Sequence, residues 1–434
     1  MTRRLVLAVG LAACGGSSAP TVDAPVTPVE PVANPARDIV STDLQFDVAQ
    51  QTGRATITFG DNAQPGATLE IGDLTISSVK LGDADLAYAT RQATPLAAAL
   101  DLALPAGTQP AVEISFAYQN HTGFSGAAAA GYTFLWPYYC GNLFPCHSQP
   151  RDGMAMTVQL AGVPSDRVAV YPAQIAEAPA YQFAWTIDAY TELALGMTSA
   201  GTQVSVWYRP NELTMAQAGT ANLVAAFDWL EKTIGPYRFG NKVGSVSVKW
   251  GPGAYGGMEH HPMWHVSSSS LGSEVTNVHE AAHGWFGDGV RIECWEDFVL
   301  SEGTVSYLAA RALEAVAPTV GEAAWTQYEA DLAGISGSNP VWPQSCNAID
   351  ILGDNLYTNA PYMRGALFYR AVALKVGAEV LDGVLAAFYA EHAGKTGRMI
   401  DMLAKIQTMT GYDPTACADA WLRSTTIPSP GACP

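Results

Sequence analysis

The spacing of apolar residues changes character once along this chain, near Pro210. From about residue 38 to residue 210, apolar residues alternate in short runs, such as Leu44 to Val48, and glycine, proline, asparagine and aspartate separate these runs. Alternation of this kind is typical of strands with one buried face, whereas the later spacing is that of helices. The sequence therefore predicts an α+β multidomain protein, with a mainly antiparallel β-rich domain at 38–210 and a mixed domain at 211–434.

The second domain is predicted to contain a small sheet followed by helices. Residues 223–234 keep a helical spacing, and residues 243–250 alternate as a strand. The remaining predicted helices cover 278–286, 299–315, 366–376, 384–390 and 399–409. Gly377 and Gly411 stand where glycine commonly ends a helix.

The composition allows sizeable cores and argues against one class of partner. The chain has 434 residues, 48% of them hydrophobic, and a formal net charge of -18 from 40 acidic and 22 basic side chains. Surfaces that bind nucleic acid need clustered lysine and arginine. We therefore expect no nucleic-acid partner, while the charge says nothing about the substrate.

The first residues resemble a bacterial export signal. Two arginines precede an apolar run from Leu5 to Ala13, which is too short to span a bilayer. The run ends at Cys14 in a pattern that resembles the lipoprotein processing box, although an ordinary signal peptide with an incidental cysteine is the alternative. We interpret 1–14 as a lipoprotein signal peptide and the Pro-rich segment 15–37 as a flexible tether. These features predict an exported protein of the bacterial envelope, either anchored to the outer membrane through lipid on Cys14 or periplasmic.

Six cysteines remain after Cys14, and an even number in an exported chain suggests disulfides. Sequence proximity favours the pairs Cys140–Cys146 and Cys417–Cys433, which leaves Cys294–Cys346. The spacings do not include paired CxxC motifs, so a zinc-thiolate site is not expected.

A candidate metal site lies in the segment His-Glu-Ala-Ala-His, from His279 to His283. On a helix, residues four apart lie on one face, so both imidazoles can bind one ion. Glu280 can then act as a general base on water without binding the metal. A catalytic zinc site also needs a third protein ligand and an open position, and Glu302 lies at a workable separation. A surface or core histidine pair is the alternative, but the acidic third ligand favours one Zn²⁺ ion bound by His279, His283 and Glu302.

The residues around this motif resemble the zinc signature of the aminopeptidase N family, which also includes leukotriene hydrolase-type enzymes. The matching segments are 279–288 and 295–303, together with an upstream strand. That strand contains Gly256, Gly257, Met258 and Glu259. The resemblance implies that the strand aligns the peptide and that its glutamate binds the free α-amine, a pairing of opposite charges. It also implies a saddle-like β domain followed by a thermolysin-like zinc domain.

The catalytic tyrosine of that family precedes a basic residue and a glycine. Tyr362 stands in such a position, followed by Met363, Arg364 and Gly365. A phenol there would donate a hydrogen bond to the oxyanion of the tetrahedral intermediate. Tyr357 and Tyr369 are neighbours that could be confused with it, and the position before Arg-Gly favours Tyr362.

The sequence departs from the family pattern at several positions. His260 stands where the family has asparagine, and Gly284 and Asp288 stand where it has glutamine and asparagine. Asp288 could orient a metal ligand or simply be an acid at a helix end. The acceptor that the family's N-terminal domain contributes to amine binding is not identifiable, and Gln149 and the region 132–139 are only candidates.

Together these features predict a zinc-dependent aminopeptidase that hydrolyses the N-terminal peptide bond by means of metal-activated water. Its expected partners are peptides with a free N-terminus. A zinc endopeptidase or dipeptide-releasing relative with an open cleft is one alternative, and a non-catalytic peptide-binding lipoprotein that retains zinc is another. Family members continue beyond the position of Pro434 into domains that cover the cleft, so the resemblance implies a more open site here.

Overall fold

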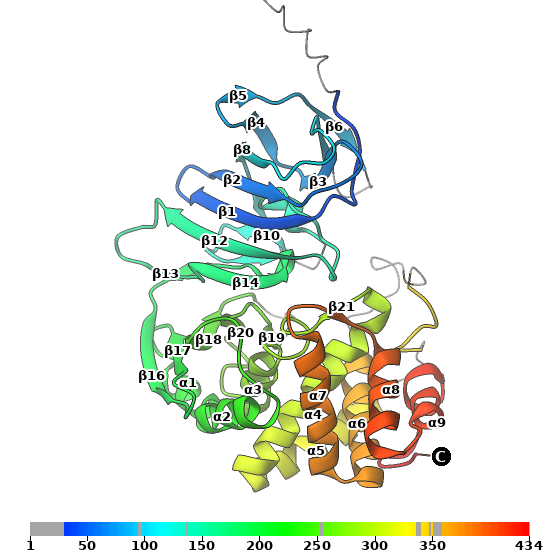
Figure 1. Cartoon of the computed structure of the whole chain (residues 1–434). Helices are drawn as coiled ribbons and strands as arrows, with labels where there is room; N and C mark the ends of the chain where they lie inside the picture. The colour runs from blue at the N-terminus through cyan, green and yellow to red at the C-terminus, as the bar shows by residue number, and fades with distance from the viewer. Residues whose placement is uncertain are drawn as a thin grey trace, which may run out of the picture.

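The structure is a computed structural model that describes residues 30–93, 98–135, 138–251, 255–335, 340–346, 349 and 358–433. The predicted signal peptide, Cys14, most of the predicted tether and Tyr357 lie outside the described residues. The lipoprotein assignment therefore stays a prediction. Figure 1 shows a β-rich domain stacked on a domain that contains the helices.

The N-terminal domain is built on a seven-stranded sheet. In spatial order its strands are β14 (Gln174–Pro179), β12 (Gly153–Ala161), β1 (Ile39–Asp47), β2 (Thr52–Phe59), β8 (Ala111–Ala117), β4 (Thr75–Leu81) and β5 (Ala84–Asp85). Neighbouring strands are antiparallel except β1 and β12, which run parallel. Alternate residues of β1 and β2, such as Phe46 and Ile57, are buried in the core of this domain. The predicted antiparallel β domain is confirmed, with this parallel pair as the exception in the seven-stranded sheet.

Smaller sheets and two short 3-10 helices complete the N-terminal domain. The sheets are β3 (Ala67–Gly72), β7 (Ala98–Leu102) and β6 (Tyr88–Gln92); β11 (Thr133–Leu135), β10 (Ser125–Ala128) and β9 (Asn120–His121); and β13 (Val168–Val170) with β15 (Thr186–Asp188). The 3-10 helices are η1 (Cys140–Asn142) and η2 (Ala180–Gln182). The second of these helices and strand β11 each contribute a residue near the candidate site described below.

The folded domain begins before residue 38, inside the segment that the sequence assigned to the tether. Asn34 and Arg37 are both buried, and Arg37 is 0% exposed. The Arg37 guanidinium donates hydrogen bonds to the carbonyl oxygens of Gly60, Gly66, Pro105 and Thr108. A buried cation requires such acceptors, so these contacts fix residues 34–37 to the β domain.

The second domain contains a five-stranded mixed sheet. Its spatial order is β16 (Thr191–Met197), β17 (Gln203–Tyr208), β18 (Lys242–Val248), β20 (Met263–Ser267) and β19 (Gly257–Met258). The sequence placed β16 and β17 in the N-terminal domain, but β17 pairs in parallel with β18. The domains therefore join between Asp188 and Thr191 and not at residue 210. Alternation of apolar residues reveals a strand but not the sheet that it joins.

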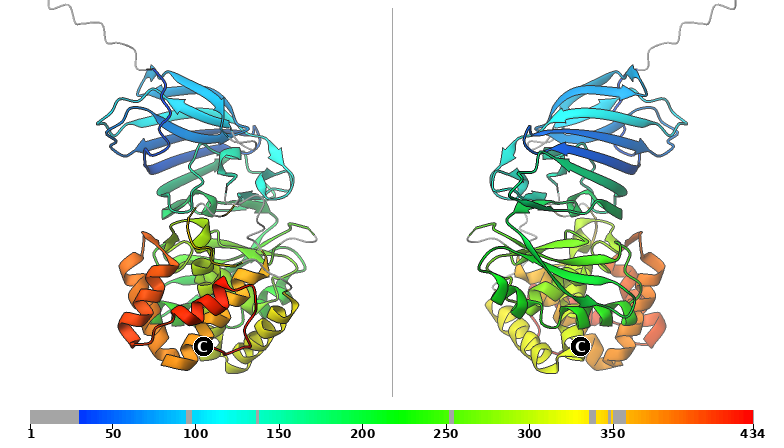
Figure 2. Two further views of the ribbon diagram at one scale, coloured as in Figure 1. Left: turned by 90° about the vertical axis from the view of Figure 1, so that its right-hand side faces the viewer. Right: turned by 90° about the vertical axis from the view of Figure 1, so that its left-hand side faces the viewer.

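Helices form the rest of the second domain. The first two pack beside β16 and β17, and the helices coloured yellow to red lie behind the green strands in the right-hand view of Figure 2. The helices are α1 (Leu213–Gly219), α2 (Leu223–Thr233), α3 (Glu274–Ala282), α4 (Phe298–Val316), α5 (Pro318–Gly334), α6 (Asn359–Val376), α7 (Ala378–His392), α8 (Met399–Thr410) and α9 (Thr415–Ala418). The 3-10 helix η3 (Trp295–Asp297), the π-helix η4 (Asp419–Arg423) and the paired strands β21 (Arg291–Ile292) and β22 (Thr396–Gly397) connect them. Gly377 and Gly411 follow α6 and α8, as predicted, and both have positive φ values, whereas α1, α5 and α9 were not predicted.

Helix α4 forms the centre of this domain. Its residues from Phe298 to Ala310 are buried on every face, which is typical of a helix surrounded by other elements. The three predicted disulfides, Cys140–Cys146, Cys294–Cys346 and Cys417–Cys433, are confirmed. Among the described residues, none of the helices has the length and apolar character required to span a membrane.

Candidate metal centre

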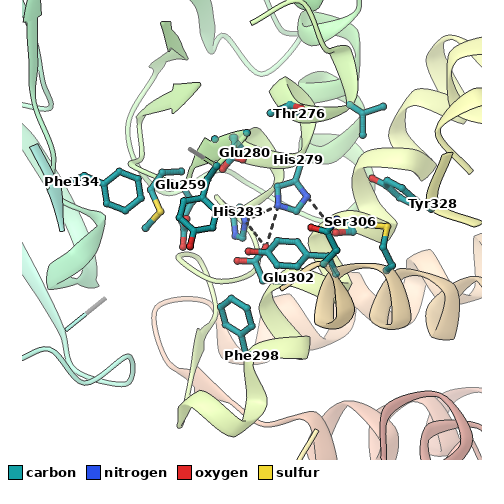
Figure 3. A pocket seen from close by; sticks show the side chains of 18 of the residues that line it. Phe134, Glu259, Thr276, His279, Glu280, His283, Phe298, Glu302, Ser306 and Tyr328 are labelled. Carbon is teal, nitrogen blue, oxygen red and sulfur yellow. Dashed lines mark hydrogen bonds and ion pairs between the residues drawn. The ribbon is translucent and has the colours of Figure 1, made fainter. Parts of the chain in front are cut away.

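Helix α3 and the residue that caps its C-terminal end provide the two candidate histidine ligands, His279 and His283. The helix begins after Ser273, whose side-chain oxygen accepts a hydrogen bond from the Thr276 amide at 3.2 Å, a common way to start a helix. His279 and His283 are four residues apart, so their rings project from one face. Both rings point toward Glu302 on the neighbouring helix α4 (Figure 3).

The three candidate ligand atoms form a nearly equilateral triangle. His279 Nε2 lies 3.2 Å from Glu302 Oε2 and 3.3 Å from His283 Nε2, and the third side measures 3.4 Å. Tetrahedral zinc with ligands at about 2.0–2.1 Å places its ligand atoms about 3.3–3.4 Å apart. These three residues therefore fit a zinc ion without rearrangement.

Hydrogen bonds on the far side of each ring orient the ligands. His283 Nδ1 donates to the carbonyl of Phe286 at 3.1 Å, and His279 Nδ1 lies 3.4 Å from the hydroxyl of Ser306. A proton on Nδ1 leaves the Nε2 lone pair free to bind a metal. Burial alone would raise the pKa of Glu302, but the charge of His283 outweighs it and lowers this pKa to about 2. An anionic carboxylate and two imidazole rings thus converge on one point, and a bound metal would take the place of the proton that gives His283 its charge.

Glu280 lies beside this centre with its carboxyl group against the backbone of Gly257. A Cβ atom on Gly257 would lie 2.5 Å from the Glu280 carboxyl carbon, so a larger residue there would displace the side chain. Burial is the main reason that the pKa of Glu280 is raised well above its usual value; the charges of Glu259 and Glu302 add to this and His283 opposes it. A carboxyl with a raised pKa is suited to accept and later release a proton.

Glu259 follows β19 and lies close to both groups. One ligand atom from each of Glu259, Glu280 and His283 falls within 4.8 Å of the other two. The Tyr181 hydroxyl of η2, in the N-terminal domain, donates a hydrogen bond to the Glu259 carboxylate. The sequence did not identify Tyr181, because nothing in the local sequence indicates a contact with a residue so distant in the chain.

The other candidates from the N-terminal domain differ in position. Gln149 is exposed and does not line the cavity at this site. Phe134, from the 132–139 region, does line it. The cavity has a volume of about 230 Å³, and Figure 3 shows Phe134 on the side of Glu259 and Tyr328 on the far side of the metal ligands. Much of its wall is apolar and comes from Phe134, Tyr255, Met258, Trp295, Phe298 and Tyr328.

Tyr362 lies next to the metal ligands. Its ring stacks on that of His279, with centroids 5.8 Å apart, and it lines the cavity. Tyr369, by contrast, is fully buried and accepts a hydrogen bond from Thr304 at 2.9 Å. The structure therefore brings Tyr362, and not Tyr369, to the candidate site.

The residues that depart from the family pattern, His260, Gly284 and Asp288, do not line the cavity. His260 is buried between the rings of Phe134 and His265, and burial lowers its pKa far below the usual value, so its ring is neutral. Asp288 is buried, and neither carboxyl oxygen has a hydrogen-bond partner among the described residues, whereas its backbone amide donates to the His283 carbonyl at 3.2 Å. A Cβ atom on Gly284 would lie 2.5 Å from the ring of Tyr237, which fills the space beside it.

Comparisons with known proteins agree with this geometry. The model of the peptidase family M1 domain matches residues 259–421. Aminopeptidase M1 of Arabidopsis thaliana is 28% identical over 171 residues, which is 38% of this chain and 19% of that protein. Leukotriene A-4 hydrolase of Xenopus laevis is 24% identical over 375 residues, 76% of this chain and 60% of that protein. The chain thus spans about a fifth of the length of the Arabidopsis relative.

The fold has solved counterparts. The M1 zinc metallopeptidase of Deinococcus radiodurans superposes with a TM-score of 0.77 at 19% sequence identity, over 91% of this chain and 95% of that one. The structure of a mutant of that protein bound to a Tyr-Ser-Ala substrate gives the same TM-score, and the superposition covers 91% of this chain and 96% of the mutant's chain. The matched domain and the ligand triangle thus identify residues 259–421 as a peptidase family M1 domain, in agreement with the predicted resemblance to the aminopeptidase N family of zinc metallopeptidases.

Proposed function

We propose that this protein is an aminopeptidase that uses one Zn²⁺ ion to hydrolyse the peptide bond after a free N-terminal residue. The observation that supports this most strongly is the position of Glu259. Its carboxyl group lies within 4.8 Å of both Glu280 and the ligand atom of His283. An α-amine bound by Glu259 leaves room for a single residue before the reacting bond.

The amine site is buried, so a carboxylate there is stabilised most by a partner of opposite charge, such as a substrate ammonium. Glu259 is largely shielded from solvent and accepts a hydrogen bond from Tyr181. A substrate ammonium would complete a charge-assisted contact there, and such contacts are stronger than neutral hydrogen bonds. A peptide whose amine is blocked would leave the Glu259 carboxylate buried and unpaired, which is costly.

The proposed chemistry distributes the remaining tasks among three groups. Zinc held by His279, His283 and Glu302 would supply Lewis acidity, which polarises a carbonyl and lowers the pKa of water. Glu280 accepts the proton of the attacking water and delivers it to the leaving amine. The Tyr362 hydroxyl donates a hydrogen bond to the carbonyl oxygen as negative charge develops on it.

A panel of aminoacyl coumarin amides tests this proposal. We expect hydrolysis that a chelator abolishes and that added zinc restores. Glu280→Gln should keep the zinc, because all three ligands remain, and lose about 10²–10⁴-fold in kcat. Equal turnover by Glu280→Gln and the wild type would reject the mechanism, and bound zinc without any turnover in the wild type would favour a peptide-binding protein.

Export to the bacterial envelope is part of the same proposal. The three disulfides support it, because disulfides persist mainly in oxidising compartments. Attachment of a lipid to Cys14 would be tested by mass spectrometry of the mature N-terminus, with Cys14→Ala as the control.

A further inference from the structure

Helix α3 ends beside the segment that follows β19. In a continuing helix the Gly284 amide would bond the carbonyl of Glu280, but here it bonds that of Ala281 at 3.3 Å. Carbonyl groups in the last turn of a helix need partners from outside the helix. The Glu280 carbonyl obtains one from His261, whose Nε2 lies 2.7 Å away.

These contacts determine which nitrogen of His261 is protonated. A carbonyl oxygen only accepts, so Nε2 holds the proton and donates it to Glu280. Nδ1 then accepts, and the Tyr237 hydroxyl donates to it at 2.7 Å. His261 is 0% exposed, and burial lowers its pKa to about 3, so the ring is neutral near pH 7. The opposite tautomer would leave the Glu280 carbonyl without this donor.

Tyr237 is itself held firmly. Its ring contacts those of Phe227, Phe239 and Trp285, with centroids 5.1 to 5.6 Å apart. The ring also occupies the space next to Gly284, where a Cβ atom would lie 2.5 Å from it. The absence of a side chain at Gly284 is therefore what admits the Tyr237 ring beside His261.

We propose that Tyr237 and His261 form a positioning pair that holds the backbone of Glu280 in register with the amine-binding segment. The inference rests on the proposed function, in which Glu259 fixes the substrate amine and Glu280 transfers a proton one residue away. His261 is two residues from Glu259 in the chain and one hydrogen bond from Glu280. Neither Tyr237 nor His261 lines the cavity, so they act on catalysis through Glu280.

A matched pair of tyrosine variants separates positioning from stability. In Tyr237→Phe, kcat on an aminoacyl substrate should fall about tenfold, because small misplacements of a catalytic group are costly, while KM changes less than about twofold. Tyr389→Phe is the control. The Tyr389 hydroxyl donates to the Pro236 carbonyl at 2.7 Å, next to Tyr237 in the chain but without a link to Glu280. Both variants lose one buried hydroxyl, so their Tm values should fall by similar amounts, but Tyr389→Phe should retain the wild-type kcat. Equal kcat values for the two variants would overturn the proposal.

Substitutions of His261 provide an independent test. The amide of glutamine can donate to the Glu280 carbonyl and accept from Tyr237, whereas leucine can do neither. His261→Gln should therefore retain more kcat than His261→Leu at equal zinc content. If His261→Leu does not fold, His261→Gln is compared with Tyr237→Phe, and a lower kcat in His261→Gln would count against the pair.

A measurement without turnover distinguishes this inference from the proposed function. With ¹⁵N-labelled histidine, NMR should report the Nε2-protonated tautomer for His261 in the wild type, and also in Tyr237→Phe, because the Glu280 carbonyl still requires a donor. An Nδ1-protonated His261 in the wild type would overturn the inference. If the wild type cleaves only peptides with a blocked amine, the aminopeptidase proposal fails, and the same kinetic comparison on those peptides still tests the pair. If the wild type cleaves peptides with neither a free nor a blocked amine, the NMR measurement of the His261 tautomer alone tests the inference.

Discussion

Gly303 and Gly365 face each other where helix α4 crosses helix α6. A Cβ atom on Gly303 would lie 2.7 Å from the Cα atom of Gly365, so the two backbones are in direct contact. Glu302 precedes the first glycine and Arg364 the second, and Tyr362 lies one turn earlier on α6. This close crossing sets the separation between the proposed third zinc ligand and the proposed oxyanion donor.

Gly365→Ala should therefore impair both stability and activity. The new methyl group forces the helices apart, and overpacking of a core typically costs about 1–3 kcal/mol. Urea unfolding and kcat/KM would measure the two effects. Gly383→Ala on α7 is the matched control, because nothing lies within 4 Å of a Cβ atom there. Alanine should stabilise that helix by about 0.5–1 kcal/mol and leave activity unchanged. A harmless Gly365→Ala would show that the crossing does not set the site.

Tyr362→Phe should lower kcat by about 10²–10³-fold with little change in KM, because the lost hydrogen bond forms mainly in the transition state. Tyr369→Phe serves as the comparison, since Tyr369 bonds Thr304 away from the cavity. That variant should lose about 1 kcal/mol of stability and keep its kcat. The reverse order of activities would assign the oxyanion role to a different residue.

Tyr181→Phe should weaken recognition of the substrate amine. A hydrogen bond to a charged group contributes about 1.5–3 kcal/mol, so we expect KM for aminoacyl substrates to rise on the order of tenfold or more, with kcat largely retained. Tyr190→Phe tests for general effects of losing a buried hydroxyl, because Tyr190 donates to the Ser247 carbonyl at 2.7 Å. If both variants raise KM equally, the contact between Tyr181 and Glu259 is not specific to amine binding.

The stability of the N-terminal domain should depend on pH through His147. Its two ring nitrogens face the Asp152 carboxylate and, at 2.8 Å, the Thr68 carbonyl. Burial alone would lower the pKa of His147, but Asp152 outweighs burial and raises it. The protonated ring therefore stabilises the fold fully below about pH 6.5, the ordinary histidine pKa, and this contribution is lost as the pH rises through the raised value.

Thermal unfolding of wild type and Asp152→Asn between pH 6 and pH 9 would measure this effect. At pH 6 the wild type should have a higher Tm than Asp152→Asn. This difference in Tm between the two proteins should shrink as the pH rises toward 9. A difference that stays constant across this range would exclude His147 as its source.

The metal ligands could be predicted from the sequence because their geometry is local. His279 and His283 share a helix face by virtue of their spacing, and a helix period also identified the segment that carries Glu302. Six helices of the second domain (α2, α3, α4, α6, α7 and α8) and strand β18 were also predicted from apolar spacing, and the glycines that end α6 and α8 from their positions.

Contacts between distant segments could not be predicted. Tyr181 reaches Glu259 across the domain interface, and the pairing of β17 with β18 moves the domain boundary. Apolar spacing reports which side of an element is buried, not which element covers it. The contact of Gly303 with Gly365 and the link from Tyr237 to Glu280 are of this kind, and both emerge only once the chain is folded.

In the proposed aminopeptidase, Glu259 recognises a free α-amine next to the zinc ligands. The most direct test compares one aminoacyl coumarin amide with its N-acetylated form, at equal concentration and with the same zinc-loaded protein. Leaving a buried charge unpaired costs about 2–5 kcal/mol, so acetylation should lower kcat/KM by about two orders of magnitude or more. Glu259→Gln should narrow that difference. Equal hydrolysis of the two substrates by the wild type would contradict the account.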